Sequence, residues 1–111
     1  MMMNIFENLP EAHAGEVIEK IAQFSQGAVR IERILSAGHA SAADYWYEQN
    51  EDEWVLLLRG QASLLIAGRG DGLEMKAGDC LELPAKLRHR VDKVSQDALW
   101  LAIHVRAGGR S

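Results

Sequence analysis

The chain has 111 residues, the size of one domain and enough to bury a core. Hydrophobic residues make up 48% and charged residues 25%, as in soluble globular proteins, and a net charge of −4 argues against a nucleic-acid surface. The single cysteine cannot form an internal disulfide, so we expect the protein to reside in the reducing cytoplasm. Residues 1–10 lack a secretory-signal pattern, and an apolar run such as residues 54–58 is too short to span a membrane.

The N-terminal part of the chain predicts a lead-in followed by a helix. Residues 1–10 look irregular, and after Pro10 apolar residues recur at helical spacing, with charged residues between them. The apolar set is Val17, Ile18, Ile21 and Ala22. Pro10 and Gly27 bracket this pattern. We expect a short amphipathic helix over residues 14–24 that packs on the outside of the domain.

From residue 28 onward the pattern changes to strands. Residues 29–35 alternate apolar and charged side chains, as expected of a half-buried strand. Further strands are predicted over residues 44–48, 53–59, 62–67, 73–76, 88–93 and 98–105, with a polar turn at residues 49–52. Short strands separated by turn signals are typical of an antiparallel sandwich or barrel. The fold class is therefore all-β.

One domain accounts for the whole chain. Residues 1–27 would form the lead-in and helix, residues 28–105 the barrel, and the glycine-rich residues 106–111 a frayed tail.

Two stretches resemble the motifs of a known family. Gly78, Pro84 and His89 have the spacing of the second cupin motif, although Lys86 and Lys93 replace its usual second glycine and asparagine. The segment from Glu53 to Gly60 resembles the end of the first cupin motif, a glutamate that opens an apolar strand ending at a glycine. The His-x-His pair expected upstream of Glu53 is missing. The chain thus resembles a small single-domain cupin, which implies a jelly-roll-like antiparallel β-barrel beside the one N-terminal helix.

The resemblance also implies a metal site. In metal-binding cupins, two histidines and a glutamate of the first motif join the histidine of the second around one divalent ion. Only Glu53 and His89 match those positions, and Glu48 stands where the second histidine would be. A carboxylate can replace an imidazole, and His104 on the last strand is a fourth candidate, so zinc, manganese, iron or nickel could bind. The competing interpretation is that the glutamates are solvated and the histidines are structural.

Aromatic residues before Glu53 are candidates for a pocket wall. Alternation places Trp46 on the same face of a strand as Glu48, and Tyr45 and Tyr47 on the other. If Glu48 faces the cavity, Trp46 forms part of an apolar pocket. Trp46 and Tyr47 are accordingly the candidate pocket residues. Ordinary packing in the core or at a dimer interface is the alternative.

Two functions are compatible with these residues. The first is a barrel whose cavity binds a divalent metal and a small molecule, with the reaction undefined. The second is a metal-free module that binds or senses a small molecule without catalysis, which the loss of the His-x-His pair favours. No nucleic-acid or membrane partner is expected. Dimerisation is an expectation from the resemblance, supported by the strand at residues 54–58 being apolar on both faces.

Overall fold

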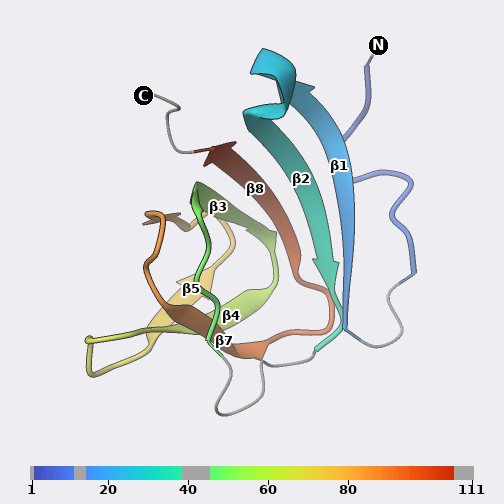
Figure 1. Cartoon of the computed structure of the whole chain (residues 1–111). Coiled ribbons are helices and arrows are strands. Elements are labelled where there is room, and N and C mark those ends of the chain that lie inside the picture. Colours follow the sequence, from blue (N-terminus) through green and yellow to red (C-terminus); the bar gives the residue numbers. More distant parts are fainter. Residues whose placement is uncertain (1, 12–14, 39–45, 107–111) are drawn as a thin grey trace.

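The computed structural model describes residues 2–11, 15–38 and 46–106. Eight strands and one short 3-10 turn make up the described part (Figure 1). In chain order these are β1 (Glu16–Phe24), η1 (Ser25–Gly27), β2 (Val29–Ser36), β3 (Glu51–Arg59), β4 (Gln61–Ile66), β5 (Leu73–Lys76), β6 (Cys80–Leu83), β7 (His89–Val94) and β8 (Leu99–Arg106). The predicted all-β fold is confirmed.

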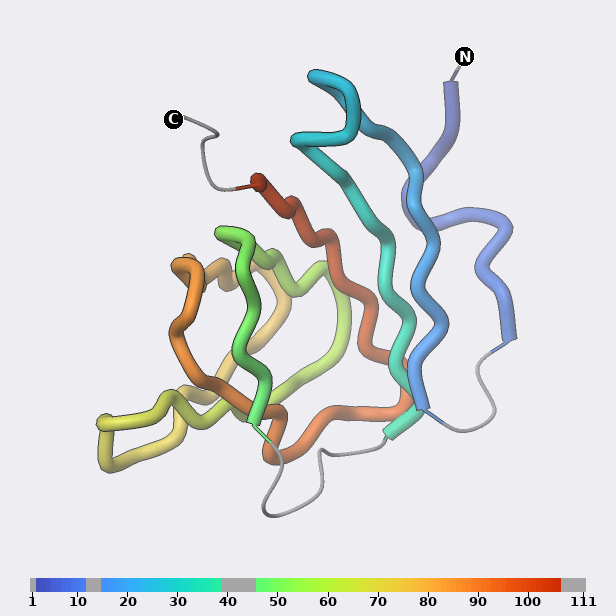
Figure 2. Tube along the Cα trace, in the orientation of Figure 1, coloured from blue at the N-terminus to red at the C-terminus, as the bar shows by residue number. Residues whose placement is uncertain are grey.

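The strands form two antiparallel sheets that face each other. The larger has the order β1-β2-β8-β3-β6 and the smaller the order β5-β4-β7. Figure 2 shows the chain curving from one sheet into the other, with the segment that begins at residue 46 running beside the start of β7. The core lies between the sheets, where Leu57, Ala98 and Ala102 are fully buried. Two curved, facing sheets are the arrangement expected of a small barrel.

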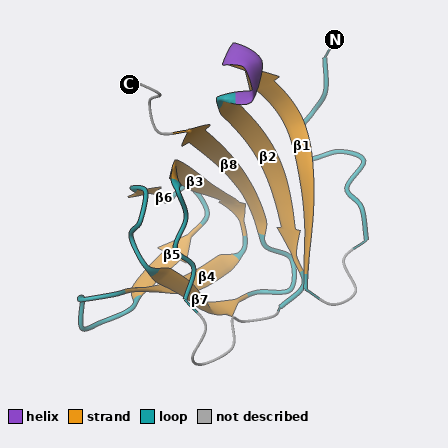
Figure 3. Ribbon diagram, viewed as in Figure 1, coloured by secondary structure: helices purple, strands orange, loops and turns teal. Residues whose placement is uncertain are grey.

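The predicted N-terminal helix is wrong. Residues 16–24 form β1, which pairs along its whole length with β2, and the only helical piece among the described residues is η1 (Figure 3). Residue 14, the expected start of the helix, lies outside the described residues. A bulge between Lys20 and Ala22 breaks the alternation of β1, so its apolar residues do not show a clean period of two. Pairing with β2 outweighed the local helical pattern.

Apart from the strand expected at residues 44–48, the strands predicted after residue 28 are confirmed with small shifts of their ends. The polar turn expected at residues 49–52 is shorter, because Glu51 and Asp52 already belong to β3. Of the strand expected at residues 44–48, residues 44 and 45 lie outside the described part, and Tyr47 makes a single antiparallel bridge to His89. No helix among the described residues is long and apolar enough to cross a membrane.

Candidate functional site

A cavity of about 290 Å³ lies between the inner faces of the two sheets. Its apolar lining comes from seven side chains, namely Ile18, Ile34, Val55, Leu64, Leu83, Val91 and Trp100. Its polar lining comes from eight more, namely Glu16, Arg30, Glu32, Tyr47, Gln49, Glu53, His89 and His104. A concave, mostly apolar space with a few convergent polar groups is the usual form of a small-molecule site.

The strand register places the polar and apolar linings at opposite ends. Arg30 on β2 lies opposite His104 on β8, which lies opposite Glu53 on β3. Four residues further along β2, Ile34 lies opposite Trp100. Alternate residues of a strand face the same way, so these rows share the inner face of the sheet. Apart from Glu16, which lies opposite Ser36 beyond Ile34, the lining on the larger sheet is therefore polar at one end and apolar at the other.

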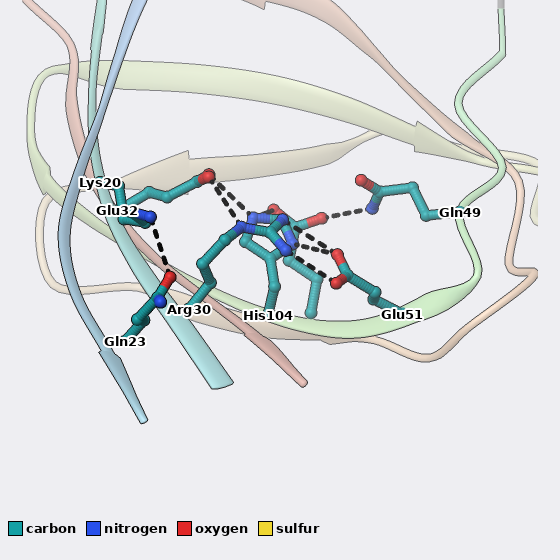
Figure 4. Close-up of polar contacts among 8 residues, drawn as sticks. Lys20, Gln23, Arg30, Glu32, Gln49, Glu51 and His104 are labelled. Carbon is teal, nitrogen blue, oxygen red and sulfur yellow. Dashed lines mark hydrogen bonds and ion pairs between the residues drawn. The ribbon is translucent and has the colours of Figure 1, made fainter. Parts of the chain in front are cut away.

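Arg30 is bound to two carboxylates at the polar end (Figure 4). Its Nη1 and Nη2 donate to the two carboxylate oxygens of Glu51 at 2.8 and 3.0 Å, and its Nε donates to Glu32 Oε2 at 3.2 Å. A guanidinium that meets a carboxylate with two parallel bonds is held in one orientation. Hydrogen bonds from Arg30 lower the pKa of Glu51 below its ordinary value, although burial acts in the opposite direction. The same bonds raise the pKa of Arg30.

His104 lies among three carboxylates and is only 5% exposed. Its Nε2 is 3.0 Å from Glu32 Oε1 and 3.7 Å from Glu53 Oε2, and its Nδ1 is 3.6 Å from Glu51 Oε1. A carboxylate accepts, so Nε2 donates to Glu32. The buried Nδ1 has no hydrogen-bond partner within the described part of the chain. Glu53 is held on its other oxygen, where Gln49 Nε2 donates to Oε1 at 2.7 Å.

His89 and Tyr47 form part of the opposite wall. The two residues exchange backbone hydrogen bonds of 2.7 and 3.0 Å, and their rings stack with centroids 5.6 Å apart. His89 Nδ1 is 3.1 Å from the carbonyl oxygen of Leu87. Because a carbonyl only accepts, Nδ1 carries the proton, and Nε2 of the neutral ring is then an acceptor.

Four of the six residues predicted from sequence line the pocket: Tyr47, Glu53, His89 and His104. Glu48 and Trp46 do not. The Glu48 carboxylate is half exposed and 4.0 Å from Arg88, and the Trp46 ring lies 5.6 and 5.8 Å from the guanidinium carbons of Arg88 and Arg90. Trp46 and Glu48 both lie outside the pocket and Tyr47 lines it, so the expected alternation holds with the opposite face inward.

Sequence reasoning missed four polar residues of this end: Arg30, Glu32, Gln49 and Glu51. In a half-buried strand the charged side chains are expected to face water, and β2 reverses this rule. Arg30 and Glu32 face the pocket, while Ile31 lies on the outer face. The sequence signal for these residues was the spacing of Arg30 and Glu32, which places both on one face of a strand. The register then brings Arg30 opposite His104.

The arrangement was tested against the metal centre that the family resemblance implies. Among the described residues, no group of three or more His, Cys, Asp or Glu side chains could hold a metal ion. A ligating histidine presents a deprotonated nitrogen to the ion. Here His104 Nε2 instead donates to Glu32, and the Glu48 carboxylate lies outside the pocket. The described side chains therefore do not fit a metal ion.

Solved structures of known proteins are similar to this chain. A candidate mannose-6-phosphate isomerase from Ralstonia eutropha JMP134 is 33% identical, with a TM-score of 0.89 over 96% of this chain and 99% of that one. A cupin superfamily protein from Desulfitobacterium hafniense DCB-2 is 21% identical (TM-score 0.68; 88% and 84% covered). The Cnp3 cupin domain from Schizosaccharomyces pombe is 10% identical (TM-score 0.68; 83% and 61% covered).

No protein-family model and no curated protein matches the sequence. The strand order, the two partial motifs and these structural neighbours agree with one another. The chain belongs to the cupin superfamily.

Proposed function

We propose that this cupin binds a small organic molecule in the pocket between its sheets, without a metal ion. The observation that carries the proposal is the row Arg30–His104–Glu53 at one end of a cavity whose other end is apolar. A volume of about 290 Å³ is close to the lower limit of common ligand sites. The apolar end would supply most of the binding free energy and the polar row would fix orientation.

The polar row is already organised by contacts within the chain. The guanidinium of Arg30 is occupied by Glu51 and Glu32, and His104 Nε2 is occupied by Glu32. A metal ion bound by His104 Nε2 or by the carboxylate of Glu51 would have to displace these hydrogen bonds. An organic ligand can use the remaining acceptor sites without breaking any of them. This difference favours the metal-free alternative over the metal-dependent one.

The name of the Ralstonia neighbour refers to a sugar phosphate. A phosphate group would need free cationic or N–H donors, as Arg and Lys clusters provide. In this pocket the one lining guanidinium, Arg30, is bound to carboxylates, and three glutamates share the lining with it. We therefore do not extend that substrate to this chain.

Thermal unfolding with a panel of small molecules tests the proposal. The protein is dialysed against a chelator and screened with and without it, and each hit is repeated on two variants. Ile34→Trp adds bulk to the pocket lining, whereas Ile31→Trp places the same ring on the outer face of the same strand. Both isoleucines are half-buried in β2, so the pair is a matched control.

We expect hits that raise the unfolding temperature equally with and without chelator. These shifts should be lost in Ile34→Trp and kept in Ile31→Trp. Shifts that appear only after a divalent metal is restored would contradict the metal-free proposal. Shifts that survive in Ile34→Trp would place binding elsewhere on the molecule.

A further inference from the structure

The polar end of the pocket combines carboxylate acceptors with donor groups that already bond to carboxylates inside the chain. The donor groups described there each make at least one hydrogen bond inside the chain: Arg30 to Glu51 and Glu32, Gln49 to Glu53, and His104 Nε2 to Glu32. Figure 4 shows these side chains directed at one another rather than at separate partners. Beyond these bonds, Arg30 keeps two N–H groups and Gln49 keeps one.

Glu53 carries the acceptor that stays available. Its Oε1 accepts from Gln49, whereas Oε2 accepts no hydrogen bond from the described residues and lies 3.7 Å from His104 Nε2, beyond bonding distance. The side chain is only 10% exposed and lines the pocket. This carboxylate oxygen has no donor among the described residues, so a donor on a ligand in the pocket could bind it.

The charged side chains around this end of the pocket are mostly negative. Two carboxylates line this end of the pocket, those of Glu32 and Glu53, beside the guanidinium of Arg30, whereas the lining residue Glu16 lies opposite Ser36 at the other end. Glu51 also binds Arg30, and Arg106 opposes Glu51 on the neighbouring strand, where it is exposed to solvent. Next to Glu32 and Glu53, His104 is 5% exposed and its Nδ1 lacks a hydrogen-bond partner in the described part of the molecule. The buried end thus has an excess of negative charge.

We propose that the ligand is a small organic cation, an ammonium with an apolar body, whose N–H groups bind Glu53 at the polar end. This inference rests on the proposed function and adds the chemical class. The apolar body would lie against Trp100 and Leu64, and the ammonium would be shared between Glu53 and Glu32. A cation in a largely desolvated acidic site is bound more strongly than a neutral donor of the same shape.

Three probes of equal size test the charge of the ligand: benzylammonium, benzyl alcohol and benzoate. Their binding is measured by isothermal titration in the presence of chelator. We expect benzylammonium to bind best and benzoate to show no binding. Glu53→Gln keeps the shape of the side chain and removes its charge, and should weaken benzylammonium about tenfold while leaving benzyl alcohol unchanged. Glu48→Gln, outside the pocket, is the matched control and should change neither.

The outcomes separate this inference from the proposed function. If benzyl alcohol or benzoate binds as tightly as benzylammonium, and Ile34→Trp abolishes that binding, the proposal that the pocket binds a small molecule is kept. The inference that the ligand is a cation is then refuted. Benzylammonium binding that Glu53→Gln leaves unchanged would also refute it. A third outcome is that none of the probes binds, but other panel molecules raise the unfolding temperature of the wild type and not of Ile34→Trp. The inference of a cationic ligand is then refuted, and the proposal of a binding pocket is kept.

Discussion

Arg33 offers the sharpest test of how the lead-in is held to the barrel. Its side chain is 5% exposed, and its guanidinium donates to the backbone carbonyls of Ile5, Glu7 and Asn8 at 3.2, 2.9 and 3.2 Å. A fourth bond, from Nε to Glu19 Oε1, measures 2.7 Å. One buried cation on β2 therefore fixes a segment that precedes it by more than twenty residues.

Arg33→Met keeps the apolar stem and removes the charged fork. The loss of three hydrogen bonds to carbonyls, at about 1 kcal/mol each, would lower the free energy of unfolding by about 3 kcal/mol. The half-exposed pair with Glu19 would add less than about 1 kcal/mol. Because part of the loss can appear as local release of the lead-in, the measured global value should be about 2–3 kcal/mol.

Urea unfolding and amide hydrogen exchange measure the two effects separately. The amides of Phe6 and Glu7, which bond to Asn4, should exchange much faster in Arg33→Met. Arg59→Met removes a guanidinium that makes one hydrogen bond, to the carbonyl of Asp97, and should leave those amides unchanged. Unchanged exchange of Phe6 and Glu7 in Arg33→Met would refute the role assigned to Arg33.

Three further predictions concern the core, a turn and pH. Leu57→Ala removes a fully buried side chain and should cost about 3–5 kcal/mol in urea unfolding, whereas Leu56→Ala, on the half-buried outer face of β3, should cost clearly less. Gly60→Ala should destabilise far more than Gly68→Ala: both glycines have positive φ, but only the Cβ added at Gly60 would lie 2.9 Å from the Ala98 backbone and 2.5 Å from Ser95 Oγ, and equal thermal shifts would contradict this. The pKa of Glu51 is lowered by Arg30, so its contribution to stability is complete above the ordinary value of 4.5 and is lost as the pH falls through the lowered pKa. Urea titrations of Glu51→Gln should show a smaller loss of stability in that acid range than the wild type does, and an identical loss would count against the Arg30–Glu51 pair.

The barrel strands could be predicted because their signals are local. Apolar runs bounded by glycine, proline or polar turns mark β3 and the strands that follow it. The spacing of Gly78, Pro84 and His89 marks the connection from β6 to β7, and these two strands pair with β3 and β4 rather than with each other. β1 could not be recognised in this way. Val17, Ile18, Ile21 and Ala22 fit a helical period, and the bulge after Lys20 removes the alternation that would have indicated a strand.

The site was only half predictable, for a different reason. Glu53, His89 and His104 were selected because their residue types suggested ligands, and the structure places all three on the pocket lining. The alternation over residues 29–35 predicts only a half-buried strand, and charged residues of such a strand usually face water. That rule fails where charges pair with one another inside a barrel, and such pairing depends on which strands become neighbours across the sheet. The cytoplasmic location and the homodimer remain predictions.

The metal content of the protein tests the central claim most directly. Protein produced without a histidine tag is dialysed against zinc, manganese, iron and nickel in turn, washed, and analysed for bound metal per chain. The account predicts sub-stoichiometric metal, equal in the wild type and in Glu53→Gln. One ion per chain that is lost in Glu53→Gln or His89→Ala would contradict it.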